Sequence, residues 1–381
     1  MDFSLPPGAV ALRDEVRAVI AEVVTPEMVH EAHATGTDSC PALAREFGRR
    51  GIIERAVDSL VDGDAVDCWV LLYEMHAAGI PQDSISQGTV TAAIVRRAGT
   101  PEQQALMLPG LLSGEAIACF GLTEPDAGSD LASIKTRAEL DGDTWVVNGT
   151  KMWTTMAHVA DWVLLLTRSD PSAARYEGYT MFLFPAKGTP GFSFDPIWTV
   201  STERSNATYY DDVRIGREYV LGEEHQGWRT LGVMLGVERG VGNTAFGVPL
   251  LRRAVEWANA AGRADDPEVR TLLGRIATEN EVTKLLTQRA IWLSRTGGPG
   301  AATAGSEAKV FSTDHYQQLA ATLQALAAPE SLLALDEPGA AAGGWIDYDV
   351  RHSVPQTIQG GTSEINRNNI AERGLGLPRA R

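Results

Sequence analysis

Residues 1–116 have apolar residues at helical spacing. In Val10–Val24, Pro41–Arg50 and Asp67–Ala78 they recur at steps of three and four residues, which is typical of amphipathic helices. Thr100-Pro101-Glu102 places a capping hydroxyl before a proline, the usual beginning of a helix. The pattern predicts an N-terminal helical domain over residues 1–116.

The pattern changes in residues 117–222. Thr136–Leu140 and Trp145–Val147 flank Asp141-Gly142, a dipeptide typical of tight hairpins, and Asn148-Gly149 predicts another turn. Further short runs rich in β-branched and aromatic residues are Trp162–Thr167, Tyr179–Phe184, Gly191–Phe194 and Ala207–Ile215. We expect a small antiparallel β barrel or sandwich.

Helical spacing returns in residues 223–381. The apolar stripe comprises Leu231, Met234, Leu235, Val241, Ala245 and Phe246. A Gly-rich segment, Glu337–Gly344, interrupts the helices before a last one from about Ser363 to Arg373. The expected fold class is therefore α+β, with a β domain between two helical domains.

Composition excludes several classes of protein. The chain has 33 Lys and Arg against 49 Asp and Glu, a net charge of -16, which argues against a nucleic-acid-binding protein. No apolar run is long enough to predict a membrane span, and the N-terminus lacks the positive charge of a signal peptide. The 3 cysteines form no recognisable pairing pattern, so we expect a cytoplasmic protein.

Common catalytic and ligand-binding motifs are missing. The sequence has no GxxxxGK phosphate loop, no GxGxxG fingerprint and no GxSxG elbow. His30 and His33 have no third ligand at metal-binding spacing, so no metal site is expected.

Two local features are candidates for chemistry. Residues 123–130 combine a proline, small residues and hydroxyls, which is typical either of an anion- or ring-binding loop or of a plain domain-junction turn. Glu238 interrupts the apolar stripe. A carboxylate there is either a general base of raised pKa or half of a structural ion pair with Arg239.

Three segments resemble the signatures of the acyl-CoA dehydrogenase family. They are CFGLTEPDAGSD at 119–130, NGTKMWTT at 148–155 and IQGGTSEINRNNIAER at 358–373. Their order and the α–β–α pattern between them match the family nearly end to end. The resemblance implies an N-terminal helical domain, a middle β domain and a C-terminal four-helix bundle, with FAD between the last two.

The resemblance also implies residue roles. The residues expected to line the flavin and its diphosphate are Phe120, Leu122, Thr123, Gly128 and Ser129. Ser129 could alternatively contact the pantetheine of the substrate. Trp153 would cover the flavin face with Thr154 or Thr155 near N5, while Thr362 and Glu364 would contact the adenosine half.

The implied reaction is α,β-desaturation of an acyl-CoA thioester. A carboxylate removes the α-proton while the β-hydride passes to flavin N5, and donors aimed at the thioester oxygen stabilise the enolate. Many members carry the base where this chain has Gly360, whose N–H would remain an oxyanion donor. A subset carries it where Glu238 lies, so Glu238 is the expected base, with Arg239 orienting it or binding CoA.

Two departures concern contacts between subunits. The segment Ala261–Pro267 lacks the usual Phe-Gly, and Gln324 is followed by alanines where glycines are usual. The overall pattern is similar to actinobacterial members that act on bulky acyl-CoAs such as steroid side chains. It implies a homotetramer or a mixed tetramer, with an electron-transfer flavoprotein as acceptor. An oxidase or monooxygenase and a non-catalytic partner subunit remain as alternatives.

Overall fold

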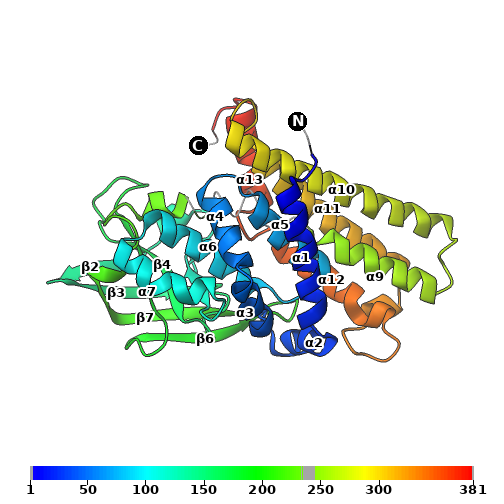
Figure 1. The fold of residues 1–381 in the computed structure, drawn as a ribbon, viewed down its shortest axis with the longest axis horizontal. Coiled ribbons are helices and arrows are strands. Elements are labelled where there is room, and N and C mark those ends of the chain that lie inside the picture. The colour runs from blue at the N-terminus through cyan, green and yellow to red at the C-terminus, as the bar shows by residue number, and fades with distance from the viewer. Residues whose placement is uncertain (1–2, 233, 235–244, 380–381) are drawn as a thin grey trace. The chain divides into compact units, whose positions relative to one another are not determined.

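The structure is a computed structural model that describes residues 3–232, 234 and 245–379 (Figure 1). The chain forms two compact units. One contains Asp14–Asp62 and Pro81–Val237, and the other contains Met1–Arg13, Gly63–Ile80 and Glu238–Arg381, each as far as it is described. The expected boundaries at 116/117 and 222/223 stay predictions, since these units group the chain differently.

The N-terminal third is helical, as predicted. Its helices are α1 (Pro7–Val23), α2 (Pro26–Thr35), α3 (Pro41–Arg49), α4 (Ile52–Val61), α5 (Val66–Ala78), α6 (Asp83–Ala98) and α7 (Pro101–Leu112). The predicted beginning of α7 is confirmed by a complete capping box. Gln103 N donates to Thr100 Oγ1 at 3.3 Å, and Thr100 N donates to Gln103 Oε1 at 2.9 Å.

A seven-stranded sheet follows, which confirms the middle β domain. Its strands are β1 (Ala118–Gly121), β2 (Arg137–Asp141), β3 (Thr144–Lys151), β4 (Trp162–Arg168), β5 (Tyr179–Pro185), β6 (Phe192–Trp198) and β7 (Arg204–Gly216). The order is β1-β4-β2-β3-β7-β6, with β5 paired to β4. Most pairs are antiparallel, but β1 and β2 each pair with β4 in parallel. The sequence pattern did not predict β1, a short strand.

The two predicted turns of this sheet have different outcomes. Asp141-Gly142 does turn the chain between β2 and β3, with Gly142 at a φ of 62°. The turn at Asn148-Gly149 is wrong, because both residues lie inside β3 at a register shift. The Asn148 side chain hydrogen-bonds Asp212 of β7, and a Cβ on Gly149 would come within 2.5 Å of Thr136 Oγ1. The glycine therefore serves close strand packing rather than a turn.

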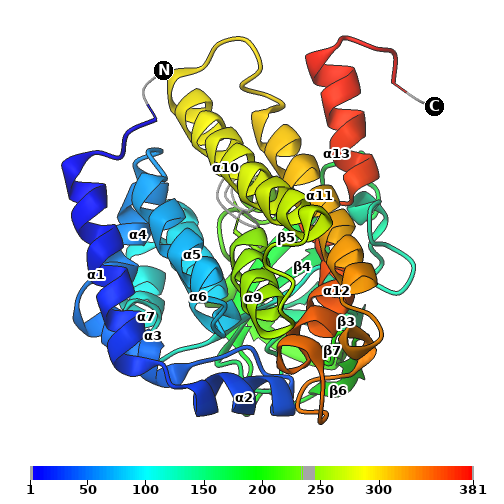
Figure 2. The ribbon, with the colours of Figure 1, turned by 90° about the vertical axis from the view of Figure 1, so that its right-hand side faces the viewer.

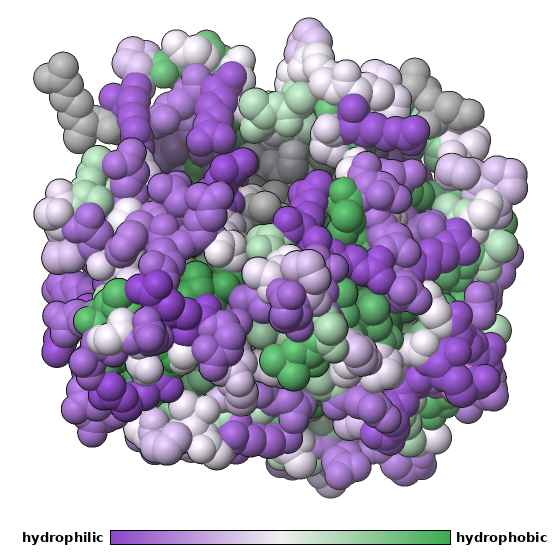
Figure 3. Space-filling view, turned by 60° about the vertical axis from the view of Figure 1, so that its left-hand side comes forward, coloured by the Kyte–Doolittle hydropathy of each residue, from purple (hydrophilic) through white to green (hydrophobic). Residues whose placement is uncertain are grey.

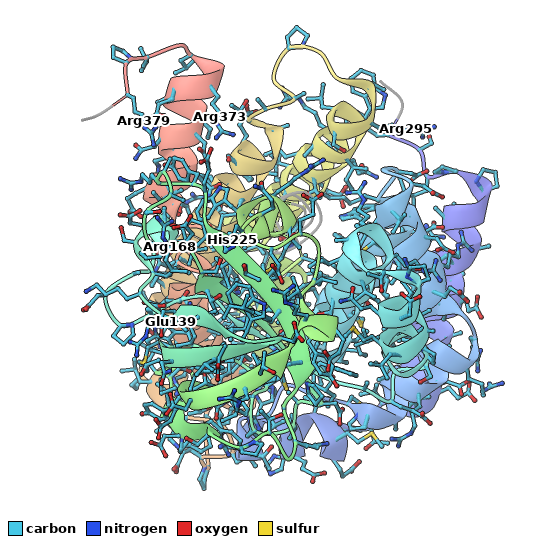
Figure 4. All side chains as sticks on the ribbon, turned by 90° about the vertical axis from the view of Figure 1, so that its left-hand side faces the viewer. Glu139, Arg168, His225, Arg295, Arg373 and Arg379 are labelled. Carbon is cyan, nitrogen blue, oxygen red and sulfur yellow. The ribbon has the colours of Figure 1, made fainter. Side chains whose placement is uncertain are left out.

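The core of the sheet is apolar and aromatic. Trp145, Phe182 and Phe184 are almost fully buried, and Trp145 meets Phe182 edge to face with ring centroids 5.9 Å apart. The loop 169–178 at the end of β4 is held by Arg168, which donates to two of its carbonyl oxygens, and by His225, which hydrogen-bonds Ser169 (Figure 4).

The C-terminal helices are α9 (Gly247–Ala260), α10 (Pro267–Thr296), α11 (Ala304–Leu326), α12 (Trp345–Gln356) and α13 (Ser363–Asn369). The long helices α10 and α11 run side by side (Figure 2). Helices α9 to α12 share one apolar core, which confirms the helical C-terminal domain. The predicted interruption contains a kinked 3-10 turn at Ala341–Gly344, and the last helix ends in a π turn at Ile370–Gly374.

Other expectations concern the surface and the cysteines. On the face drawn in Figure 3, hydrophilic side chains predominate. Within the described ranges, no helix has the length and apolarity needed to cross a membrane, and no acidic, His or Cys cluster could hold a metal ion. Cys40, Cys68 and Cys119 are all buried free thiols.

A pair of close carboxyl groups lies at the beginning of α6. The backbone N–H groups of Gln82 and Asp83 donate to the Asp38 carboxyl at 3.1 and 3.2 Å. Burial and the neighbouring carboxylates of Asp83 and Glu203 raise the pKa of Asp38 well above its usual value. Burial and Glu203 raise the pKa of Asp83 to about 7. The folded protein therefore binds these protons more tightly than the unfolded chain, and their contribution to stability falls as pH rises from about 4 to 7.

Replacing Asp83 by asparagine is expected to stabilise the protein near neutral pH, because it removes a charge that the folded state disfavours. The midpoint of thermal unfolding should rise by about 2–4 °C at pH 8, which corresponds to about 1 kcal/mol of unfolding free energy, and by less at pH 5. Asp211→Asn, at an exposed carboxyl, is the matched control. Equal shifts at both pH values would contradict this account of Asp83.

Candidate functional site

The first motif, residues 119–130, spans most of β1 and the loop after it. β1 ends at Gly121, and the loop then closes a small turn in which Glu124 and Ala127 exchange backbone hydrogen bonds at 3.0 and 3.2 Å. Pro125 lies inside this turn, where its fixed φ suits the bend. Asp130 ends the loop and is hydrogen-bonded by Ser133 at 2.5 Å and Arg175 at 2.6 Å. Both ends of the loop are thus anchored.

Glu124 anchors the loop from within. Its side chain is 7% exposed and accepts hydrogen bonds from Lys135 N at 2.6 Å, Thr136 N at 2.8 Å and Lys151 Nζ at 3.0 Å. Burial alone would raise the pKa of Glu124, but Lys151 and the donors around Thr136 outweigh it and lower the pKa. The carboxylate is therefore a fixed structural anion rather than a proton acceptor.

Lys151 joins the first motif to the second. Its side chain is 0% exposed, and Nζ donates to Leu122 O at 2.9 Å as well as to Glu124. Met152 N also donates to Thr123 O at 2.8 Å. Burial lowers the pKa of Lys151 to about 8 against the opposing pull of Glu124. The two sequence motifs are thus one physical unit.

Trp153 follows directly and presents its ring to the surface. Its φ is 60°, a left-handed conformation that is uncommon for a bulky side chain, and the residue is 54% exposed. Its neighbour Thr154 is fully buried, paired through its backbone with Asn206 and through its hydroxyl with Thr208. Thr155 hydrogen-bonds Ser205 at 3.3 Å. An aromatic face is thus exposed on a rigid, strained backbone.

The remaining predicted residues of this unit lie at the end of β1 and in the loop after it. Phe120 is the last but one residue of β1. The loop contains Leu122, Thr123, Gly128 and Ser129. Within the part of the chain that the structure describes, the hydroxyls of Thr123 and Ser129 make no hydrogen bond. A Cβ on Gly128 would meet nothing nearer than 4.0 Å, so its backbone is open. The loop offers free donors over a buried ionic anchor.

The third motif, residues 358–373, lies in the other unit and spans the loop after α12, helix α13 and most of the π turn that follows. Gly360 and Gly361 have φ values of 65° and 90°, which favour glycine at both positions. Thr362 caps α13 by accepting from Ile365 N at 3.2 Å, and Asn366 Nδ2 donates to Gly361 O at 2.7 Å. Backbone and side-chain hydrogen bonds at the beginning of the helix lower the pKa of Glu364. The glycine loop is therefore well defined.

Glu238 and Arg239, the predicted base and its neighbour, lie outside the described residues. The two departures from the family pattern lie inside them. Arg263 donates to Asp266 and to Leu326 O at 2.7 Å, tying the α9–α10 connection to the end of α11. Gln324 and Ser331 hydrogen-bond each other at 2.7 and 3.3 Å. Both polar side chains are engaged within this chain.

Sequence reasoning missed the two residues that hold the site together. Glu124 and Lys151 lie inside the motifs but were not singled out. A signal was present: Lys151 ends a stretch of strand with alternating apolar residues, where a long cation is unfavourable unless paired. The partner could not be found from spacing, since 27 residues separate the two.

Family models match almost the whole chain. The acyl-CoA dehydrogenase N-terminal domain matches residues 7–115, the acyl-CoA dehydrogenase middle domain matches residues 119–213, and the acyl-CoA dehydrogenase C-terminal domain matches residues 225–375.

Full-length relatives agree with the models. Acyl-CoA dehydrogenase FadE26 of Mycobacterium tuberculosis is 33% identical, over 100% of both chains. Acyl-CoA dehydrogenase FadE29 of the same organism is 31% identical, over 100% of this chain and 99% of that protein. Among solved structures, the Tcur3481-Tcur3483 steroid ACAD is 30% identical with a TM-score of 0.88, and the ChsE4-ChsE5 complex from M. tuberculosis is 32% identical with a TM-score of 0.87; each match covers 100% of both chains.

Proposed function

Because this chain belongs to the acyl-CoA dehydrogenase family, we propose that it is an FAD-dependent enzyme that desaturates an acyl-CoA thioester between its α and β carbons. The observation that carries the proposal is the buried Glu124–Lys151 contact, which ties the first motif loop to the end of β3, with the exposed Trp153 ring two residues further on. Such a rigid exposed ring suits the face of a planar ligand.

The residues present fit FAD. The free hydroxyls of Thr123 and Ser129 can donate to a ring edge and to a diphosphate, and the open backbone at Gly128 allows close approach. Phe120, Leu122 and either Thr154 or Thr155 complete the flavin-binding set that we propose, with Thr362 and Glu364 on the adenosine side; the half-buried Thr155 is more accessible than the fully buried Thr154. When bound, FAD would supply the acceptor for the β-hydride.

The chain's own residues would then handle the proton and the developing charge. Glu238 takes the α-proton, and the Gly360 N–H donates to the thioester oxygen as it becomes an enolate. Ser129 and Arg239 are proposed to contact the CoA portion. A donor held in place by the glycine loop reduces the reorganisation that the reaction would need in water.

Relatives favour a bulky substrate and a mixed assembly. A structure at 30% identity is described as a steroid ACAD, and it and the ChsE4-ChsE5 complex are each named for two chains. We therefore propose a steroid-type acyl-CoA substrate and a tetramer, homomeric or mixed. An electron-transfer flavoprotein as acceptor and a cytoplasmic location follow from the resemblance and the composition.

The direct test is the visible spectrum of freshly purified protein, followed by anaerobic addition of straight-chain and steroid-side-chain acyl-CoAs. About one FAD per chain with bleaching by a member of the panel is expected. Half an FAD or none would instead indicate a subunit of a mixed assembly. Rapid reoxidation by oxygen after bleaching would favour an oxidase.

Trp153→Ala is expected to lower FAD affinity about tenfold, because ring stacking contributes roughly 0.5–1.5 kcal/mol beyond the buried area. Flavin release on dilution, followed by fluorescence, measures the effect. Trp198→Ala is the matched control, since Trp198 is also exposed, at 57%, but lies on β6. Equal flavin loss in both variants would remove Trp153 from the proposed site.

A further inference from the structure

A continuous chain of side-chain hydrogen bonds runs along the C-terminal helices toward the glycine loop. It begins at the buried Arg253–Asp349 pair, where the guanidinium lies 2.5 Å from Asp349 Oδ1. The same oxygen accepts from Tyr316 Oη at 2.9 Å, and Tyr316 Oη lies 3.3 Å from His352 Nδ1. The remaining links join His352 Nε2 to Gln356 Nε2 at 2.8 Å, and Gln359 Nε2 to Gln356 Oε1.

With the glutamine amides oriented as they are, the donors and acceptors along these hydrogen bonds agree with one another. The Asp349 carboxylate only accepts, so the Tyr316 hydroxyl donates to it and must accept from His352 Nδ1–H. His352 Nε2 then carries no proton and accepts from the Gln356 amide, whose oxygen accepts from Gln359. In this assignment His352 donates through Nδ1 and accepts through Nε2.

The beginning of the chain is rigid. Asp349 is 1% exposed and Arg253 8%, and the Arg253 guanidinium lies 4.2 Å from the centre of the Trp345 ring. Burial tends to lower the pKa of Arg253, but Asp349 outweighs it and raises that pKa. The positive charge of Arg253 is thus permanent.

The His352 ring is also fixed by packing. Tyr348 stacks on it with centroids 5.2 Å apart and an angle of 13°, and Phe246 meets it edge-on at 5.5 Å. Phe246 itself stacks on Tyr316 at 5.6 Å. A change of the imidazole orientation would disturb both of these ring contacts of His352 at once.

The end of the chain is the peptide that precedes Gly360. Gln359 is the last link, and the peptide between Gln359 and Gly360 carries the N–H that we propose as the oxyanion donor. The other side of the loop is held by Asn366, which is 1% exposed and donates to Gly361 O and Thr362 O, and by the bond from Ser363 N to Thr357 O at 2.9 Å. On the side of Gln359, the side-chain hydrogen bond to Gln356 adds a restraint to the backbone bond from Gln359 N to Pro355 O at 3.0 Å.

We propose that His352 is a positioning residue that, through Gln356 and Gln359, aims the Gly360 N–H at the thioester oxygen. The inference rests on the proposed function and deepens it. His352 does not touch substrate; it transmits the fixed geometry of the Arg253–Asp349 pair to the loop. Loss of a whole oxyanion donor costs about 10²–10³ in rate, and a misaimed donor costs part of that.

The test uses an acyl-CoA analogue with sulfur at the β position, which cannot be desaturated and whose enolate gives a long-wavelength charge-transfer band with bound flavin. The pH at half-maximal band measures how strongly the site stabilises the enolate. His352→Phe keeps a flat ring against Tyr348 but removes both nitrogens. We expect it to raise that pH by about one unit and to slow acyl-CoA bleaching about tenfold, part of the loss for a whole donor, with flavin content unchanged.

Two further variants test whether the hydrogen bonds, rather than the packing of the rings, carry the effect. Tyr316→Phe removes one hydroxyl, should shift the band in the same direction, and decides the question if His352→Phe fails to fold. Adding Tyr316→Phe to His352→Phe should cost little more than His352→Phe alone, because the chain is already broken. The control is His315→Phe, at a histidine whose Nδ1 lies 2.8 Å from Phe311 O of its own helix.

The outcomes separate the two proposals. A wild-type protein without flavin or without the band overturns the proposed function and this inference with it. A wild type that forms the band, with both variants forming it at the same pH as the His315→Phe control, overturns the positioning role alone.

Discussion

Replacing Glu238 by glutamine is expected to leave FAD bound and to slow anaerobic bleaching by acyl-CoA about 10²–10⁴-fold, the usual contribution of a general base. The amide has nearly the shape of the carboxylate but cannot accept the α-proton. Because Gly360 stands at the alternative position for a base, that position supplies no second carboxylate that could take over. Stopped-flow absorbance at the flavin maximum measures the rate.

The matched control is Glu256→Gln, which removes an exposed carboxylate from α9 and should leave the rate unchanged. Binding of a non-reactive acyl-CoA should also be unchanged in Glu238→Gln. Full activity in Glu238→Gln would show that another group is the base and would return Glu238 to the ion-pair interpretation with Arg239.

Much of the fold was predictable because local rules agree with one another there. The capping box at Thr100 and the hairpin at Asp141-Gly142 are complete within a few residues, so the sequence alone specifies them. Asn148-Gly149 has the same local signal as a hairpin. It is part of a strand because Asn148 hydrogen-bonds Asp212, a residue far along the chain. The turn propensity of a dipeptide carries no information about a contact with a residue so far along the chain.

The candidate site was also predictable only in part, and for the same reason. Motif residues such as Thr123 and Trp153 could be named from the resemblance, but the left-handed backbone of Trp153 could not. The Glu124–Lys151 pair and the chain through His352 both join residues distant in sequence. Their partners are decided by the fold, and no spacing rule connects them.

Lys151→Met is expected to have the largest effect on the structure of the site. Removing the ammonium leaves the Glu124 carboxylate buried at 7% exposure without its cation, and breaking a buried pair in this way costs about 3–5 kcal/mol. It also removes the bond to Leu122 O that holds the first motif loop. Both the unfolding temperature and the flavin content of the purified protein should fall sharply.

The matched control is Lys135→Met. Lys135 is a lysine of the same region whose side chain is 78% exposed and 3.5 Å from Asp126, so its removal should change stability by less than about 1 kcal/mol. Glu124→Gln should destabilise as well, because the new side-chain amide would turn a donor toward one of the N–H groups of Lys135 and Thr136. The double variant Glu124→Gln, Lys151→Met should lose less than the sum of the single losses, since one network is removed twice. Additive losses, or normal flavin content in Lys151→Met, would mean that the first motif loop and the end of β3 are positioned independently of this pair.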